Sequence, residues 1–285
     1  MKLGVHWSLW VWVLPTAVGI FFALQWYPAV YLPDGSIVPI GPDSFYHAVR
    51  IIEAVDGPLI QFDPRMHVPD GSWVSWPWGY DWLSARVLAA VLTVTGAQEP
   101  MLVLVHFPLI GLVINTALLL AICRSLDLSR VAILLAMLAY ASLPITQELH
   151  AVGAIDHQYV EHFFVLMSLL LLLRWADRPD GRLEAGALGV CLGIAPAAHV
   201  SLFVLQFPIL AFIFFLWVRG DASRFSRSSV VFSAALLFST LMILLPSGPF
   251  RDGQFLLYTL SSFHLLVATT LLCSLSFSSA DPVDE

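Results

Sequence analysis

The sequence predicts an all-α protein, a polytopic transmembrane helical bundle of about eight spans with a long outer-face first loop that contains short helices. Hydrophobic residues make up 59% of the 285 residues and charged residues only 12%, whereas soluble domains have about 45–50% and about 25%. The mean hydropathy is +0.83. A chain this apolar cannot cover its own surface in water, which excludes a soluble enzyme, a disordered chain and a coiled coil.

The apolar runs predict the spans in order. Residues 1–29 form the first span, which is too long for the core of a secretory signal and ends in aromatic residues typical of a membrane border. About seven more spans fill residues 101–273. We expect them at residues 101–123, 131–147, 158–173, 185–199, 200–218, 229–246 and 254–273. Residues 274–285 predict a polar tail without a fold of its own.

Residues 30–100 form the long first loop and carry eight acidic residues and three arginines. Cytoplasmic loops are enriched in Lys and Arg, and nine of the 13 basic residues fall on one side of the predicted bundle. We therefore expect a multi-pass protein of the cell (inner) membrane with a cytoplasmic N-terminus and the first loop on the outer face. The net charge of −7 argues against a nucleic-acid partner, which needs a basic surface.

Ionisable residues at membrane depth are costly and raise a functional hypothesis, and two clusters qualify. The first cluster is Gly41-Pro42-Asp43-Ser44-Phe45-Tyr46-His47-Ala48-Val49-Arg50, in which the Gly-Pro break predicts the start of a short helix. Asp43 and His47 are four residues apart and share a helix face, and Arg50 follows three residues later. Asp43 is either a helix N-cap alone or a carboxylate that binds a divalent cation or orients a polar substrate.

The second cluster runs from His150 to His162 and joins two predicted spans. Gly153 allows a sharp turn, Asp156 is expected to cap the next helix, and His157 and Glu161 lie one helical turn apart on one face. The structural alternative is a capped, aqueous turn whose histidines only line the membrane interface.

Both clusters lie on the predicted outer face, so Asp43 and Asp156 can converge on one hard cation. Carboxylate and water ligands suit Mg²⁺ or Mn²⁺, often with a substrate phosphate in the shell, and nearby histidine favours Mn²⁺. Such an ion stabilises a departing diphosphate. We therefore predict catalytic and metal-binding roles for Asp43 and Asp156, and substrate contacts for His47, Arg50 and Glu161.

Three segments carry a resemblance to a known family. The first cluster resembles the Asp-x-x-Tyr-His-x-x-Arg motif in the first outer loop of oligosaccharyltransferase catalytic subunits. Asp70-Gly71 followed by Trp76-Pro77-Trp78-Gly79-Tyr80-Asp81-Trp82 resembles the later part of that loop. Gly153-Ala154-Ile155-Asp156-His157-Gln158 with Glu161 is similar to the second acidic motif of the family. The order of the spans agrees as well.

The resemblance implies a membrane glycosyltransferase that moves a glycan from a polyprenyl-diphosphate carrier to the asparagine of Asn-x-Ser/Thr, using Mn²⁺ or Mg²⁺. Its partners are then the lipid-linked oligosaccharide, an acceptor polypeptide and membrane lipid. By carry-over, Asp43 is the first metal carboxylate and contacts the acceptor amide, and Asp156 is the second. The third motif position, an acid or histidine in the family, is Gln158 here, and His157 is the substitute metal ligand.

The family continues with further spans, about thirteen in all, and a soluble outer domain with a Trp-Trp-Asp motif, which these 285 residues lack. We expect part of a longer gene product, a shortened relative that needs a partner, or an inactive relative. Two alternatives stay open: an O-glycosyltransferase of the same membrane class that uses a hydroxyl acceptor, and a non-catalytic assembly subunit or transporter. The position of the acids at span ends rather than at the midplane argues against transport.

Overall fold

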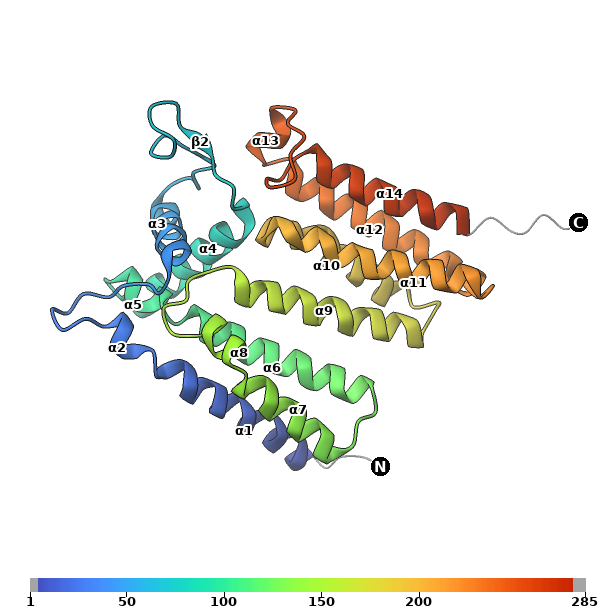
Figure 1. Cartoon of the computed structure of the whole chain (residues 1–285), viewed down its shortest axis with the longest axis horizontal. Helices are drawn as coiled ribbons and strands as arrows, with labels where there is room; N and C mark the ends of the chain where they lie inside the picture. Colours follow the sequence, from blue (N-terminus) through green and yellow to red (C-terminus); the bar gives the residue numbers. More distant parts are fainter. Residues whose placement is uncertain (1–4, 279–285) are drawn as a thin grey trace, which may run out of the picture. The chain divides into compact units, whose positions relative to one another are not determined.

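The computed structural model describes residues 5–278 and is mostly helical (Figure 1). The chain divides into two compact units. The first comprises Met1–Ile60 and Tyr80–Leu166, and the second comprises Gln61–Gly79 and Met167–Glu285. The last helix continues to Ser278. Residues 279–285 lie outside the described part, so the polar tail stays a prediction.

The first unit consists of the helices from the first half of the chain. They are α1 (Val5–Leu24), α2 (Tyr27–Val30), α3 (Pro42–Asp56), α4 (Trp78–Thr95), α5 (Pro100–Leu104), α6 (Phe107–Ser125), α7 (Arg130–Ser142), α8 (Pro144–Leu149) and the first half of α9 (Gln158–Asp177). α1 contacts α6, α7 and α8, and α3 contacts α5 (Figure 1). The buried core of Val30, Ile51, Leu88, Leu104 and Ile155 joins α3, α4 and α5 to the turn before α9.

The second unit combines a short hairpin with the C-terminal helices. They are β1 (Phe62–Asp63), β2 (Ser72–Trp73), α10 (Arg182–Ala198), the 3-10 helices η1 (Val200–Leu205) and η2 (Ala222–Phe225), α11 (Gln206–Val218), α12 (Ser226–Leu244), α13 (Gly248–Arg251) and α14 (Ser262–Ser278). β1 and β2 are antiparallel, with Phe62 opposite Trp73. Gln61 binds the turn after α12, since its side chain donates to the carbonyl of Pro246 and accepts from the N–H of Gly248, both at 2.9 Å.

Two glycines let α10 and α12 approach each other closely. Gly189 and Gly193 lie one turn apart on α10, and a Cβ at either position would overlap the backbone of α12; at Gly193 it would lie 2.8 Å from the carbonyl oxygen of Leu236. Small residues at this spacing are typical of tight helix pairs in membranes. This contact forms the centre of the second unit.

The prediction of about eight spans is not supported. Within residues 5–278, four helical segments are long and apolar enough to cross a membrane, and they correspond to four of the predicted runs. They are Leu9–Val30, Pro100–Ser125, Gln158–Asp177 and Arg227–Leu244.

The other predicted runs form shorter helices for identifiable reasons. α7 has 13 residues, about 20 Å of helix at 1.5 Å per residue, against about 30 Å of hydrocarbon. It ends because Pro144 disfavours the helical conformation at Leu143, which is extended. Val200–Leu216 is also a shorter apolar segment. α10 and α14 have 17 residues each, and α14 begins at Ser262 rather than at residue 254.

The predicted first loop contains more regular structure than short helices. α3 has 15 residues and α4 has 18, and the β1–β2 hairpin adds a small antiparallel pair to the all-α prediction. The two helices of this region supply part of the site described next.

Candidate metal centre

α3 begins at a sharply defined point. Gly41 precedes the helix with φ of +84°, which glycine adopts without steric penalty. Pro42 occupies the first helical position, where its missing N–H is not needed. Asp43 therefore lies inside the first turn rather than at the N-cap, and its side chain is exposed. The helix dipole stabilises a carboxylate at this position.

One face of α3 carries polar side chains into the interior of the first unit. His47 and Arg50 are each only 1% exposed, and they alternate with the buried Ser44, Ala48 and Ile51 at the helical spacing. The polar residues of the first cluster therefore differ in exposure: Asp43 is exposed, whereas His47 and Arg50 are buried.

The second cluster is held against this region by a tight turn. Gly153 has φ of +87°, so the predicted sharp turn is confirmed. Its N–H donates to the carbonyl of Val105, and its own carbonyl accepts the N–H of Ile40, both at 2.8 Å. Asp156 and His157 follow directly, and the carboxylate of Asp156 accepts the backbone N–H of His157 at 2.7 Å, one residue before α9 begins.

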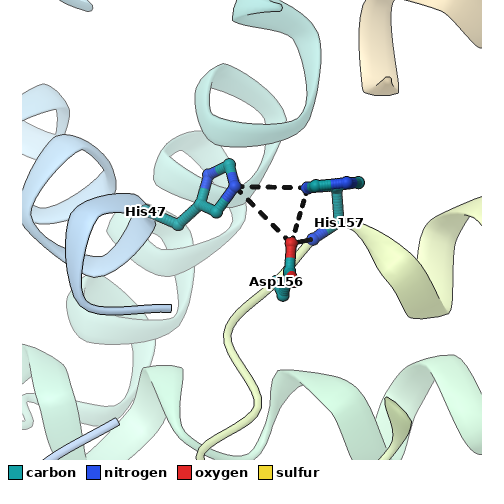
Figure 2. A group of neighbouring side chains, drawn as sticks. All are labelled: His47, Asp156 and His157. Carbon is teal, nitrogen blue, oxygen red and sulfur yellow. Dashed lines mark hydrogen bonds and ion pairs between the residues drawn. The ribbon is translucent and has the colours of Figure 1, made fainter. Parts of the chain in front are cut away.

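The two clusters meet in a group of three potential ligands. Ligand atoms of His47, Asp156 and His157 all lie within 4.8 Å of one another (Figure 2). His47 Nε2 lies 3.2 Å from His157 Nδ1 and 3.6 Å from Asp156 Oδ1, and His157 Nδ1 lies 2.5 Å from the same oxygen. One carboxylate and two imidazoles directed at a common point are a donor set that can hold a divalent cation.

A second carboxylate lies behind the group and was not assigned a role from the sequence. Asp81, in the first turn of α4, is completely buried. Its Oδ1 lies 2.6 Å from His47 Nδ1, and its Oδ2 lies 2.5 Å from Nη1 of Arg50. The sequence offers one signal for this role, the position of Asp81 between the aromatic residues Tyr80 and Trp82. Aromatic neighbours favour burial, and a buried acid is almost always paired.

Two tyrosines border the group on its interior side. Tyr80 is 3% exposed, and its ring stands edge-on to that of His47 at 5.2 Å between centroids. Its hydroxyl lies 3.1 Å from the hydroxyl of Tyr159. Burial chiefly, followed by the neighbouring Tyr159 and then the nearby carboxylates, raises the pKa of Tyr80 well above 10, so it remains a neutral hydroxyl.

Asp156 is ionised at neutral pH. Burial by itself raises the pKa of this carboxyl, but the hydrogen bonds and positive charge of His157, together with His47, outweigh burial and leave the pKa below the ordinary 3.8. The protein therefore presents a permanent negative charge between two imidazoles, as a cation site requires.

The other predicted site residues occupy different surroundings. Glu161 Oε1 lies 3.4 Å from Nε2 of His157, one helical turn away as expected. Arg50 is enclosed and forms an ion pair with Asp81; its contact with a substrate stays a prediction. Asp43 is not part of the three-residue group formed among the described residues. That Asp43 and Asp156 bind one ion stays a prediction.

The fold is that of the N-terminal part of archaeal oligosaccharyltransferases. No family model matches the chain, and no curated protein sequence matches it; the similarity comes from solved structures. At the identities involved it establishes the fold, and together with the four apolar segments it indicates a membrane protein.

Three of these structures are of the oligosaccharyltransferase from Archaeoglobus fulgidus. Its complex with an inhibitory peptide and a dolichol-phosphate is 20% identical, with a TM-score of 0.80 over 96% of this chain and 33% of that chain. The form tethered to an acceptor peptide containing the NVT sequon is 22% identical, with a TM-score of 0.79 over 97% and 34%. The complex with Zn and sulfate is 22% identical, with a TM-score of 0.78 over 95% and 35%. The chain thus spans about a third of the length of these proteins.

Proposed function

We propose that the chain acts in a membrane glycosyltransferase of the oligosaccharyltransferase type, which transfers a glycan from a polyprenyl-diphosphate carrier to an acceptor asparagine. The observation that carries the proposal is the convergence of the two clusters, because His47 and His157 are 110 residues apart in sequence yet 3.2 Å apart in space. The fold shared with a protein whose structures contain a dolichol-phosphate and an acceptor peptide supports the same reaction class.

The residues present fit a divalent cation. Asp156 and His157 are its proposed ligands, and Asp43, exposed one turn before His47, is the proposed carboxylate on the open side. The two carboxylates suit Mn²⁺ or Mg²⁺, and the histidine ligand favours Mn²⁺. When bound, such an ion supplies Lewis-acid stabilisation of the negative charge on the departing diphosphate.

Asp43 also has the position expected of an acceptor-binding group. Its carboxylate accepts a hydrogen bond from the N–H of the acceptor amide, which raises the electron density at that nitrogen. The nitrogen attacks the anomeric carbon, the bond between this carbon and the diphosphate oxygen breaks with inversion, and the amide proton is released to water. The exposure of Asp43 supports this role, because a polypeptide acceptor must reach it from solvent.

The site is proposed to face the outer side of the cell (inner) membrane. Asp156 and His157 immediately precede the candidate span Gln158–Asp177, which supports a position at a membrane border rather than at the midplane. The arginine distribution in the sequence supports a cytoplasmic N-terminus and a multi-pass arrangement.

Glycan transfer to a fluorescent Asn-x-Thr peptide tests the proposal. The assay uses membranes of the cell that makes this chain, so that any partner is present, with added lipid-linked oligosaccharide and Mn²⁺. We expect transfer with the unaltered chain and its loss with Asp156→Ala, while Asp63→Asn, a buried acid of the second unit, retains it. Equal transfer by the Asp156→Ala membranes would contradict the proposal.

The acceptor peptide separates the proposed function from its closest alternative. An Asn→Gln version of the peptide accepts no glycan if the acceptor is asparagine. Glycan on its threonine would instead identify a hydroxyl acceptor and an O-glycosyltransferase. The NVT peptide bound by the structurally similar protein favours the first outcome.

A further inference from the structure

We propose that His47 is itself a ligand of the cation, that Asp81 positions it, and that the site is a two-histidine, one-carboxylate centre selective for a transition ion such as Zn²⁺ over Mg²⁺. The inference rests on the proposed function for the identity of the reaction, while its test measures metal binding alone.

Asp81 determines which nitrogen of His47 carries the proton. An ionised carboxylate only accepts hydrogen bonds, so the contact of 2.6 Å with Asp81 Oδ1 places the proton of His47 on Nδ1. The lone pair of the neutral ring is then on Nε2, which is the atom directed at His157 and Asp156. The other oxygen of Asp81 forms an ion pair with Nη1 of Arg50 at 2.5 Å, so both oxygens of this buried carboxylate have partners.

His157 repeats the same pattern. Its Nε2 lies 3.4 Å from Glu161 Oε1, and its Nδ1 faces His47 and Asp156. Each imidazole thus has a carboxylate at its outer nitrogen and presents its inner nitrogen to a common point. Metal-bound histidines almost always donate their other N–H to a carboxylate, a carbonyl or water in this way. A single carboxylate–histidine pair is common in proteins, whereas two that converge beside a third carboxylate indicate a ligand set.

The separations suit a small tetrahedral ion. With bonds of about 2.0–2.1 Å, two ligands of Zn²⁺ stand about 3.3 Å apart. The distance between His47 Nε2 and His157 Nδ1 is 3.2 Å, and that between His47 Nε2 and Asp156 Oδ1 is 3.6 Å. The contact of 2.5 Å between His157 Nδ1 and Asp156 Oδ1 is a hydrogen bond, and it must open by about 0.8 Å when an ion replaces the proton.

The donor atoms determine the metal preference. Imidazole nitrogen suits Zn²⁺ and other transition ions, whereas Mg²⁺ prefers oxygen ligands and retains several waters. Two of the three donors are nitrogen, and both histidines are nearly enclosed, at 1% and 6% exposure. The site therefore disfavours Mg²⁺ by ligand type.

Competitive metal titration of the purified full chain in detergent tests the inference. After removal of bound metal, the Zn²⁺ affinity is measured against a chromogenic chelator, and Co²⁺ is used as a spectroscopic probe. We expect one Zn²⁺ per chain that a thousandfold excess of Mg²⁺ does not displace. His47→Ala should abolish the site, and Asp81→Asn should weaken it by about 10–100-fold, the usual effect of losing an outer hydrogen-bond partner. Asp81→Asn should also shift the visible Co²⁺ absorption, which a merely structural residue would leave unchanged.

Matched variants keep the outcomes distinct. Asp63→Asn removes a buried carboxylate of the second unit and should retain full Zn²⁺ affinity. Should Asp81→Asn fail to fold, Glu161→Gln tests the other orienting carboxylate, whose side chain is 26% exposed, and about a tenfold loss is expected. Zn²⁺ binding unchanged in His47→Ala, or displaced readily by Mg²⁺, would overturn the inference.

Failure of the inference and failure of the proposed function give different results. If Zn²⁺ binding depends on His47 and no glycan is transferred, the proposed ligand set is supported and the proposed reaction is wrong. If transfer depends on Asp156 and Zn²⁺ binding does not depend on His47, the reaction stands and this ligand set is wrong.

Discussion

His47 and Asp81 form a buried pair, with 2.6 Å between Nδ1 and Oδ1, in the interior of the first unit. The pair joins α3 to α4 and leaves the other nitrogen of His47 directed at Asp156 and His157. Because Arg50 contacts the same carboxylate, the orientation of one candidate ligand depends on a fully enclosed ionic triad.

Replacing Arg50 should destabilise the protein strongly. Arg50→Ala leaves the buried carboxylate of Asp81 without its guanidinium partner, and loss of one partner of a buried ion pair costs about 3–5 kcal/mol. Chemical unfolding in detergent measures the change. Arg124→Ala, at an exposed arginine of α6, should stay within about 0.5 kcal/mol of the unaltered chain. Equal stability of the two variants would show that the triad contributes nothing to folding.

The turn that delivers Asp156 should depend on Gly153 for two reasons. Gly35→Ala provides the matched control, since Gly35 has a similar φ of +86° and a Cβ added there would meet no atom within 4 Å. This variant should lose only the stability that the left-handed backbone conformation costs an alanine, about 1–2 kcal/mol. Gly153→Ala adds an overlap, because its Cβ would lie 2.6 Å from Val30 Cγ2, for which about 1–3 kcal/mol more is expected.

Gly153→Ala should also weaken metal binding, because Asp156 is displaced, while Gly35→Ala leaves it intact. Unfolding and Zn²⁺ affinity measured on both variants check this. Identical behaviour of the two would contradict the account of the turn.

The α10–α12 contact predicts that Gly193 tolerates no larger residue. Gly193→Val places methyl groups against the carbonyl of Leu236 and should destabilise the second unit by at least about 1–3 kcal/mol. Val190→Leu on an exposed position of the same helix serves as the control. Limited proteolysis or unfolding that finds both variants equally stable would rule out the close helix approach.

His150 predicts a loss of stability in mild acid. Burial, opposed in part by the hydrogen bond to Thr146, lowers the pKa of His150 from 6.5 to about 4. The native state therefore holds this ring neutral where the unfolded chain binds a proton. The contribution of the neutral His150 to the free energy of unfolding is fully present above about pH 6.5. It falls as the pH drops toward 4, by up to about 3 kcal/mol.

The variant His150→Gln stays neutral at every pH and isolates this effect. The neighbouring His162 and Tyr140 remain in both proteins, so the difference between the two pH profiles belongs to His150. Unfolding measured from pH 7 to pH 4 should show a shallower decline for His150→Gln. Parallel profiles would exclude a buried neutral His150.

The helix start and the turn that form the site locally could be predicted from the sequence, whereas contacts between residues far apart in the sequence could not. The Gly-Pro break before Asp43 and the glycine before Asp156 indicated a helix start and a turn, and both are present. The pairing of His47 with Asp81 depends on how α3 packs against α4. Spacing along a chain carries no information on that packing, so Asp81 received no role from the sequence.

The prediction of about eight spans is not supported for a related reason. Hydropathy records how apolar a run is, but the length of the helix depends on where the backbone can no longer continue. α7 ends early because Leu143 precedes Pro144. α14 begins at Ser262, eight residues after the start of the predicted apolar run at residue 254. Apolar runs of this kind therefore overestimate the lengths of the helices they form.

X-ray absorption spectroscopy of the Zn²⁺-loaded protein tests most directly whether the two clusters form one metal centre. The account predicts scattering from two imidazoles in the unaltered chain and from one imidazole, with much weaker binding, in His47→Ala. Imidazole scattering that is the same in both proteins would contradict it.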